Sequence, residues 1–385
     1  MSGPGPAGFE FREGGRPRTT IVRAAGARLW DAEGRSYVDL GASHGVGNVG
    51  SADPEVAGAV ARQAAELIHL GSGYASPVRT AFLARLVGLL PPSLSRVFLS
   101  NSGTESVEAA IKIARSATGR PKVVAAMRGF HGRTLGSLSA TWRKEFRAPF
   151  EPLVPEFVHV PYNDPAALAA AVDERTALVL LEPVQGEGGV HVGTPDYLRS
   201  ARAAADRVGA LLAWDEVQTG IGRTGRLFAF EHSGVVPDVL TLAKSLAGGV
   251  PIGATVTTTD VESLFQGSHH STFGGNPLAC AAGSAALERV VRDRLSERAE
   301  RLGRTAIDRL RALPSEKVRE VRGLGLLLGL ELKDRVAPVL ARLESRGFLA
   351  ISAGSTVLRL LPPLVIEEDD WAAGLEAIEE AIGHG

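Results

Sequence analysis

The sequence contains a single cysteine, Cys280, among 385 residues. One thiol cannot form a disulfide within the chain, so a disulfide-stabilised framework is excluded. The sequence also lacks an excess of either charge: 42 Lys and Arg residues stand against 43 Asp and Glu residues, for a formal net charge of −1. This balance argues against a nucleic-acid partner and against electrostatic attachment to a membrane.

Long apolar runs are also missing. The most apolar stretch, Leu324 to Leu330, is far shorter than the roughly 20 residues that a membrane span requires. The first residues are polar and turn-prone and do not resemble a signal peptide. No group of His and Cys residues has the spacing of a metal site. We therefore expect a cytoplasmic protein with no membrane association and no metal centre.

What the chain does contain is a globular composition, with 44% hydrophobic and 22% charged residues. Its length predicts two or three structural units. We expect a flexible N-terminal arm at 1–15, a large α/β domain at 53–287, and a small α+β domain that combines 16–52 with 288–385.

Short apolar runs alternate with helical patterns in the large predicted domain. The runs are 97–99, 123–126, 178–181, 211–214 and 239–242. Short continuous apolar runs between amphipathic helices are typical of a mostly parallel sheet that is buried on both faces. Ligands bind such sheets beyond the carboxyl ends of the strands, so the residues after each run are candidates for a site.

The flanking segments show different patterns. Residues 27–40 predict two short strands joined by a turn, and the spacing from Val56 to Ile68 predicts a helix. Beyond residue 288, the spacing from Leu295 to Leu310 predicts a long amphipathic helix. We expect it to be followed by a strand at 324–332, a helix near 337–346, a strand at 357–361 and a closing helix from about 367.

The first apolar run ends in a small, glycine-containing loop that opens a helix. Such a loop offers unpaired N–H groups and the positive end of a helix dipole, which together bind phosphate. Ser102 and Glu105 also fit an ordinary capping box, and the loop alone does not separate the two interpretations. It has neither a Walker loop nor a Gly-x-Gly-x-x-Gly fingerprint.

Two charged residues stand at the ends of later runs. Asp215 follows the fourth run and Lys244 the fifth. Each has an ordinary explanation in isolation, a cap or ion pair for Asp215 and a lysine reaching to solvent for Lys244. Together with the anion loop and Phe130, however, they supply what pyridoxal phosphate requires: an amine for its aldehyde, a carboxylate for its ring nitrogen, an aromatic wall and a phosphate site.

At these residues the chain resembles the class III aminotransferases, which implies a pyridoxal-phosphate-dependent transferase of fold type I. The resemblance runs from about residue 20 to the end and rests on ordered motifs at 101–105, 130–134, 181–189, 214–225, 242–244, 271–277 and 359–364. Within the class, the chain is most similar to the acetylornithine aminotransferase branch. Segments 127–130 and 135–142 resemble the subgroup that acts on lysine or ornithine linked to a carrier protein, the LysW type.

The resemblance implies roles toward the cofactor. Lys244 would bond the cofactor's aldehyde and shuttle the proton, and Asp215 would keep the pyridine nitrogen protonated. The remaining cofactor contacts would be Ser102, Gly103, Thr104, Phe130, Gln218 and Thr272. Because Thr272 would reach the phosphate of the other subunit's cofactor, the resemblance also implies a homodimer.

It implies substrate contacts as well. Arg133 would bind a distal carboxylate with Ser271 beside it, and Arg359 would bind the α-carboxylate of glutamate or 2-oxoglutarate. Glu187 would pair with Arg359 when the other substrate, an acylated diamino acid, is bound, and Glu182 would line the same pocket. The family pairs arginine with carboxylates because the guanidinium binds them bidentately.

The chain departs from the family near the substrate entrance, where His44 replaces a tyrosine or small residue and Ser51 a common histidine. An ordinary loop histidine remains open for His44, and His131 is interpreted as lying behind Phe130. The implied reaction is transfer of a terminal amine between an acetylated or carrier-linked diamino acid and 2-oxoglutarate, in arginine or lysine biosynthesis. A carrier would be an acidic partner protein.

Three alternatives remain open from the sequence. Another class III enzyme could use 4-aminobutyrate or free ornithine. A nucleotide- or nicotinamide-dependent α/β enzyme would need no lysine-bound cofactor. A non-catalytic relative would bind pyridoxal phosphate or a partner for regulation.

Overall fold

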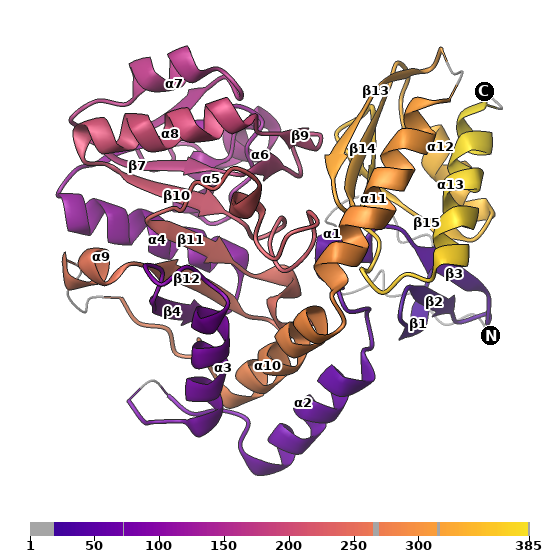
Figure 1. Cartoon of the computed structure of the whole chain (residues 1–385), viewed down its shortest axis with the longest axis horizontal. Helices are drawn as coiled ribbons and strands as arrows, with labels where there is room; N and C mark the ends of the chain where they lie inside the picture. Colours follow the sequence, from indigo (N-terminus) through magenta and orange to yellow (C-terminus); the bar gives the residue numbers. More distant parts are fainter. Residues whose placement is uncertain (1–18, 72, 265–268, 314–315, 384–385) are drawn as a thin grey trace.

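The structure is a computed structural model that describes residues 19–71, 73–264, 269–313 and 316–383. The predicted arm at 1–15 lies outside these residues. Figure 1 shows two parts side by side, a larger one around one sheet and a smaller one that holds both the N-terminal strands and the C-terminal helix. No helix in the described ranges is long and apolar enough to cross a bilayer.

The larger part is built on one twisted sheet. Within the described residues this sheet has seven strands, in the order β4 (Arg96–Ser100), β12 (Gly253–Thr257), β11 (Val239–Leu242), β10 (Leu211–Asp215), β7 (Thr176–Leu181), β5 (Lys122–Ala126) and β6 (Phe157–Val160). β12 is antiparallel to both neighbours, and every other neighbouring pair is parallel. The prediction of a mostly parallel sheet is therefore confirmed. All strands except β12 point the same way, so their carboxyl ends meet at one edge.

Each face of this sheet is covered by its own apolar layer. Leu178 and Leu180 of β7 pack in one cluster with Val107 and Ile111 of α4 (Gly103–Thr118). Val179 and Leu181 belong to the cluster that includes the apolar face of α8 (Pro195–Val208). Successive strand residues point to opposite faces, so a strand that is buried throughout needs apolar residues at every position. That requirement explains the continuous runs. β6 and β12 are missed by this pattern because His159 and the threonines of β12 interrupt them.

Helices surround the sheet. They are α2 (Pro54–Glu66), α3 (Pro77–Gly88), α4 (Gly103–Thr118), α5 (Leu135–Ala140), α6 (Lys144–Arg147), α7 (Pro165–Ala171), α8 (Pro195–Val208), α9 (Thr259–Leu264) and α10 (Pro277–Arg292). The predicted helix through Ile68 is too long, because α2 ends at Glu66 and Leu67 adopts an extended conformation. Leu67 and Ile68 are 41% and 57% exposed.

The smaller part contains two further sheets. One has the order β1 (Ile21–Ala25), β2 (Arg28–Asp31), β3 (Ser36–Asp39) and β15 (Phe348–Leu349), and the other β13 (Val318–Leu324), β14 (Leu327–Leu332), β17 (Val357–Leu360) and β16 (Ile351–Ala353). Its helices are α11 (Leu295–Arg311), α12 (Ala337–Ser345) and α13 (Glu368–Gly383). β3 pairs with β15, so the N-terminal strands do join the C-terminal segment. The division of the chain at 52 and 288 into domains stays a prediction.

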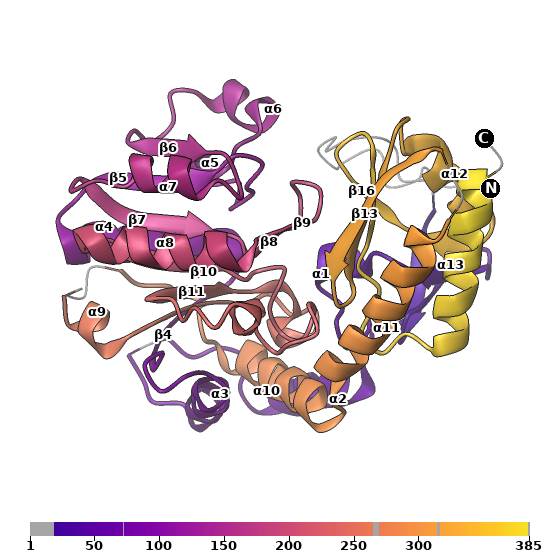
Figure 2. The ribbon, with the colours of Figure 1, turned by 45° about the horizontal axis from the view of Figure 1, so that its top comes forward.

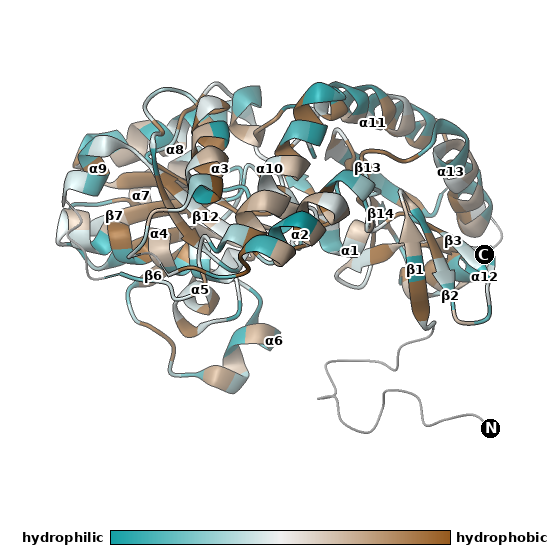
Figure 3. Cartoon of the chain, turned by 90° about the horizontal axis from the view of Figure 1, so that it is seen from below, coloured by the Kyte–Doolittle hydropathy of each residue, from teal (hydrophilic) through white to brown (hydrophobic). Residues whose placement is uncertain are grey.

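One strand of the smaller part differs from the prediction. The strand expected over 324–332 is interrupted by a turn at Gly325, where φ is +52°, and only Leu327–Leu332 belongs to β14. The chain before the turn is β13, which pairs antiparallel with β14. Arg319, Glu320 and Arg322 interrupt the apolar residues of β13, so this strand lacks the continuous apolar run that identified the other strands. In Figure 3 the strand β7 is coloured hydrophobic, whereas the outer turns of α11 are hydrophilic.

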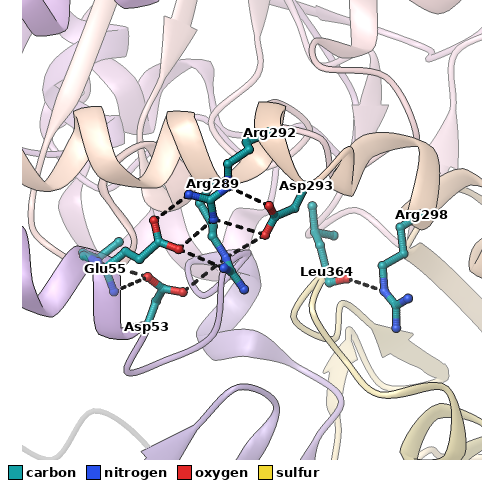
Figure 4. A network of polar contacts seen from close by, with 8 residues as sticks. Asp53, Glu55, Arg289, Arg292, Asp293, Arg298 and Leu364 are labelled. Carbon is teal, nitrogen blue, oxygen red and sulfur yellow. Dashed lines mark hydrogen bonds and ion pairs between the residues drawn. The ribbon is translucent and has the colours of Figure 1, made fainter.

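The two parts meet where α10 passes into α11, at Arg294, whose φ is +53°. An ion-pair network lies beside this junction (Figure 4). Glu55 of α2 accepts hydrogen bonds from Arg289 at 3.0 Å and from Arg292 at 2.7 Å, and Asp293 accepts from Arg292 at 2.9 Å. The network ties the start of α2 to the end of α10.

Candidate active site

The carboxyl ends of the parallel strands converge on one cavity of about 280 Å³. Residues from the ends of β4, β5, β7, β10 and β11 line it, as the strand-end argument predicts. The lining residues are Ser102, Gly103, Thr104, Phe130, His131, Gly132, Arg133, Glu182, Glu187, Asp215, Val217, Gln218 and Lys244.

The N-terminus of α4 forms one end of the cavity. Ser102 is the N-cap: its hydroxyl accepts from the N–H of Glu105 at 3.3 Å and donates to the Glu105 carboxylate at 3.0 Å. The capping interpretation is therefore correct for the Ser102 side chain. The N–H groups of Gly103 and Thr104 lie in the first helical turn, where an α-helix has no carbonyl to offer them. The loop thus caps a helix and still presents donors to an anion.

Hydroxyl groups extend this anion-binding end. The Thr104 hydroxyl lies 2.8 Å from that of Thr134 and 2.6 Å from that of Ser137. Gly132 approaches them so closely that a Cβ on it would lie 2.3 Å from the Thr104 oxygen, and its φ is +141°. Only glycine fits this position without displacing the hydroxyl groups.

Asp215 ends β10 with its carboxylate buried. One oxygen lies 2.8 Å from Nδ1 of His131, and the other accepts from the N–H of Val217 at 3.1 Å and from the hydroxyl of Thr241 at 3.2 Å. Burial disfavours the charged imidazole, but the hydrogen bond and charge of Asp215 outweigh it and raise the pKa of His131. His131 therefore contacts Asp215 directly, rather than only lying behind Phe130. Thr241 is the one polar residue of an apolar strand, and that contrast is the signal that identifies it.

Glu182 follows β7 and is also buried. Its two oxygens accept from the N–H of Phe130 at 3.0 Å and of Gly186 at 3.1 Å. Burial raises its pKa to about 7, against the opposing charge of His131. Glu182 thus fixes the main chain that carries Phe130.

Lys244 begins the short turn after β11 with a φ of +45°, a conformation that is unusual for a lysine and is found at functional sites. Within the described part of the chain, its amine has no hydrogen-bond or ion-pair partner. Burial lowers its pKa, which increases the fraction of neutral, nucleophilic amine at neutral pH. Lys244 is half-buried and lines the cavity, rather than extending from the outer surface into solvent.

Arg359 of β17 carries the second cation near the cavity, and its side chain is fully buried. Its Nη1 donates to Glu187 at 2.6 Å and to Oε1 of Gln218 at 3.2 Å, and its Nη2 lies 3.2 Å from Nδ1 of His44. Burial opposes the charge of Glu187, but its polar neighbours, with the Arg359 guanidinium among them, outweigh burial and lower the pKa of that carboxyl group. Glu187 lies between β8 (Val184–Gln185) and β9 (His191–Val192), a hairpin that Figure 2 shows extending toward the smaller part.

Phe130 and Arg133 also line the cavity. The guanidinium of Arg133 is exposed and lies 5.3 Å from the ring centre of Phe146. The Phe146 ring in turn meets that of Phe130 edge to face at 6.0 Å. Arg133 therefore lines the cavity itself, whereas the buried Arg359 contacts two of its lining residues, Glu187 and Gln218.

Two residues of the expected site lie elsewhere. Ser271 and Thr272 line a separate hollow with Asn101, and Thr272 is exposed. The hydroxyl of Ser271 accepts from the N–H of Gly274 at 3.0 Å. A single chain does not bring these two residues to Lys244.

Comparison with known proteins places this cavity in a family. A family model described as "Aminotransferase class-III" matches residues 11–382. The chain is 49% identical over 366 residues to the acetylornithine aminotransferase of Methanopyrus kandleri, with 94% of each chain covered. It is 45% identical over 368 residues to the LysW-aminoadipate semialdehyde transaminase of Deinococcus radiodurans, covering 94% of this chain and 86% of that one. The structure matches that of Toxoplasma gondii ornithine aminotransferase, which has PLP at its active site, with a TM-score of 0.91 at 35% identity, covering 94% of this chain and 90% of that one.

Proposed function

The chain belongs to the class III aminotransferases, and on that basis we propose that it transfers the terminal amine of an α-N-acylated diamino acid to 2-oxoglutarate, and from glutamate in the reverse direction. The observation that carries this proposal is the buried Arg359 held by Glu187 beside the Lys244 cavity. Arginine or lysine biosynthesis, in the cytoplasm, is the proposed setting.

Enzymes of this class use pyridoxal phosphate, and the cavity residues fit it. The free N–H groups of Gly103 and Thr104 suit a phosphate, and Phe130 offers an aromatic wall. Asp215 can accept one more hydrogen bond, from a ring nitrogen, and Gln218 lies within the same cavity for the ring's oxygen. Lys244 supplies an unpaired amine. When bound, the cofactor supplies an electron sink for the carbanion next to the transferred nitrogen.

The protein's own contribution is charge placement and proton movement. Lys244 takes the proton from the carbon that bears the amine and returns it, a role that its lowered pKa favours. Asp215 would hold the protonated ring nitrogen of the cofactor, and His131 keeps Asp215 oriented through the 2.8 Å contact. Ser102 supports these groups only indirectly, by capping α4.

Substrate choice follows from the two arginines. An acylated diamino acid and glutamate both carry a carboxylate far from the reacting amine, and we assign it to Arg133. Only glutamate has a second carboxylate on the carbon that reacts, and we assign this one to Arg359. Glu187 neutralises Arg359 when the reacting carbon has no carboxylate and withdraws when it has one. Bidentate pairing makes arginine suitable for both positions.

A basic rim beside the cavity favours a carrier-linked donor as a second candidate. The rim consists of Arg128, Arg143, Lys144 and Arg147, which have no carboxylate partner among the described residues and line a groove of about 720 Å³. Glu145 and Glu151 line the same groove, so these cations are an excess over its carboxylates. The groove borders the cavity, because Arg143 and Arg133 both lie over the ring of Phe146. An excess of unpaired cations in a groove beside a cavity attracts acidic partners. An acidic carrier protein suits this rim, whereas a small acetyl group makes no use of it.

We propose a homodimer in which Thr272 and Ser271 complete the site of the other subunit. Their separation from Lys244 in one chain supports this arrangement, because both belong to the motif that resembles the family's. The exposed Phe273, 61% accessible, lies beside them and suits a subunit contact.

The test is a substrate panel with the purified enzyme. We expect kcat/KM to be highest for N-acetylornithine or for lysine acylated by an acidic carrier, with 4-aminobutyrate and free ornithine well below. Equal or higher kcat/KM for the latter two would contradict the proposal. Borohydride trapping of the cofactor on Lys244 without any amine transfer would instead favour the non-catalytic relative.

The rim is tested separately with the double variant Lys144→Glu and Arg147→Glu. If a carrier docks there, kcat/KM for the acidic donor falls about tenfold or more at low salt, while that for N-acetylornithine changes little. Arg62→Glu, which reverses an exposed cation on α2, is the matched control. An equal loss for both donors would exclude docking at the rim.

A further inference from the structure

The segment that carries His44 has an unusual backbone. Ala42, Ser43 and His44 have φ values of +41°, +49° and +63°, and Gly45 follows at +84°. Three successive non-glycine residues in the left-handed region are unfavourable, and such turns persist where the surroundings hold them. Asp39 stabilises this turn. One oxygen of its buried carboxylate accepts hydrogen bonds from the N–H of Gly41 at 2.8 Å and of Ala42 at 2.7 Å.

The strained turn brings His44 to Arg359 by two routes. Its main-chain carbonyl accepts from Nε2 of Gln218 at 3.0 Å, and Gln218 in turn accepts from Arg359. Its imidazole Nδ1 lies 3.2 Å from Nη2 of Arg359 and 3.6 Å from Oε1 of Glu187. His44 therefore contacts Arg359 directly through its imidazole and indirectly through its main-chain carbonyl and Gln218.

The contact distances indicate which atom carries the imidazole proton. A guanidinium has only donors, so Nδ1 must accept from Arg359 and the proton must lie on Nε2. In the alternative tautomer, the proton lies on Nδ1 and points at Glu187. That contact, at 3.6 Å, is longer than the 3.2 Å contact with Arg359, and the N–H of Nδ1 would then face the N–H of Nη2, which is also a donor. His44 is thus a neutral acceptor for Nη2, while Glu187 and Gln218 occupy Nη1.

We propose that His44 is a positioning residue for Arg359 that, together with Glu187, sets the balance between the two substrates. A carboxylate that binds Arg359 end-on takes one N–H from each Nη group, so it competes with Glu187 at Nη1 and with His44 at Nη2. The proposal rests on the proposed function in one respect only, that Arg359 binds a substrate carboxylate. It goes beyond that function because it assigns the second Nη group to an uncharged acceptor.

An imidazole suits this role because it releases the arginine more easily than a carboxylate does. The His44 side chain is 60% exposed, so water can replace Arg359 as its partner. As a neutral acceptor, the imidazole also adds no second charge beside Glu187. Loss of His44 should therefore favour ligands that carry a carboxylate at Arg359, while ligands without one should gain nothing.

The experiment compares two unreactive ligands by calorimetric titration of the holoenzyme. Glutarate has carboxylates for both Arg133 and Arg359, whereas N-acetylnorvaline has only the carboxylate for Arg133. His44→Gly removes the acceptor and relieves the strained φ, so folding is not compromised. We expect this variant to bind glutarate about fivefold more tightly, equivalent to about 1 kcal/mol, without tighter binding of N-acetylnorvaline.

Two further variants separate the acceptor from the turn. His44→Asn places Oδ1 where Nδ1 was and tolerates the left-handed conformation, so it should restore the wild-type ratio of the two affinities. Ser43→Gly relaxes the same turn without touching Arg359 and should leave the ratio unchanged. In parallel, His44→Gly should raise kcat/KM for 2-oxoglutarate relative to the acylated donor by a similar factor.

The outcomes are distinct. An unchanged or weaker glutarate affinity in His44→Gly overturns the proposal, as does an Asn variant that behaves like the Gly variant. If the wild type transfers no amine from acylated donors, the proposed function fails, yet the glutarate titration still decides the role of His44.

Discussion

Removal of the charge of Glu187 tests the core of the substrate argument. Glu187→Gln keeps the shape of the side chain and an acceptor for Arg359 but leaves the buried guanidinium without its counter-charge. The pair has an N–O distance of 2.6 Å, and Arg359 has no solvent exposure. The state in which Glu187 neutralises Arg359 is the one that the acylated donor requires. We therefore expect the substitution to destabilise this state most.

The magnitude follows from the geometry. Two unit charges about 4 Å apart attract by about 4 kcal/mol at an effective dielectric constant of about 20. The Glu187 side chain is 30% exposed, and His44 and Gln218 remain as acceptors, so we take about half of this, about 2 kcal/mol. This corresponds to about a 30-fold change in a rate or binding constant.

The assay measures the two half-reactions separately, by the absorbance of the bound cofactor after rapid mixing. With N-acetylornithine, kcat/KM should fall about 30-fold. With glutamate it should stay level or rise, because the incoming carboxylate replaces the lost charge. The pKa of Glu187 is lowered, so its carboxylate stays charged above the ordinary value of 4.5, and the contrast with wild type should persist throughout the neutral range. An equal loss in both half-reactions would refute the reasoning, since it would mean that Glu187 does not discriminate between the substrates.

Three other predictions concern the cofactor end, acid stability and the link between the parts. Gly132→Ala should weaken cofactor binding at least about tenfold in equilibrium dialysis, because its Cβ would lie 2.3 Å from the Thr104 hydroxyl oxygen; unchanged binding would show that these hydroxyl groups do not matter. Arg292 and Arg289 lower the pKa of Glu55 to about 2, so the stability it contributes is present above the ordinary pKa of 4.5 and is lost as pH falls toward 2. The gap in melting temperature between wild type and Glu55→Gln should therefore narrow between pH 5 and pH 2.5, and a constant gap would contradict the assignment. Arg223 is fully buried and donates to the carbonyls of Leu326 at 2.9 Å and Pro362 at 2.6 Å, so Arg223→Leu should lower the free energy of unfolding by about 3 kcal/mol in a denaturant titration.

Much of the large sheet could be predicted because burial on both faces leaves a local trace. The runs at 178–181 and 211–214 lie in β7 and β10, and each is continuous because neither face meets water. β13 could not be found in this way, because it is only partly buried and Arg319, Glu320 and Arg322 interrupt its apolar residues. The extra apolar residues after α2 misled the helix prediction for the opposite reason: Leu67 and Ile68 are exposed in the single chain, and only their surroundings could show that.

The residues of the candidate site also fall into those that a local sequence rule could place and those that it could not. Asp215, Lys244 and the loop at 102–104 follow strands directly, so the rule for parallel sheets was enough to bring them to one edge. Thr272 and Ser271 could not be placed by that rule, and in one chain they lie away from the cavity. Their roles stay predictions until a dimer is observed.

The sequence by itself therefore determined the class of chemistry, because residues that directly follow parallel strands meet at one edge of the sheet and can be found from the chain alone. Only the tertiary structure decided what Arg359 meets. Glu187 and His44 lie 172 and 315 residues away from it along the chain. Contacts of that range depend on how β17, the β8–β9 hairpin and a strained turn fold against one another, and no local pattern records the distance between atoms on separate elements.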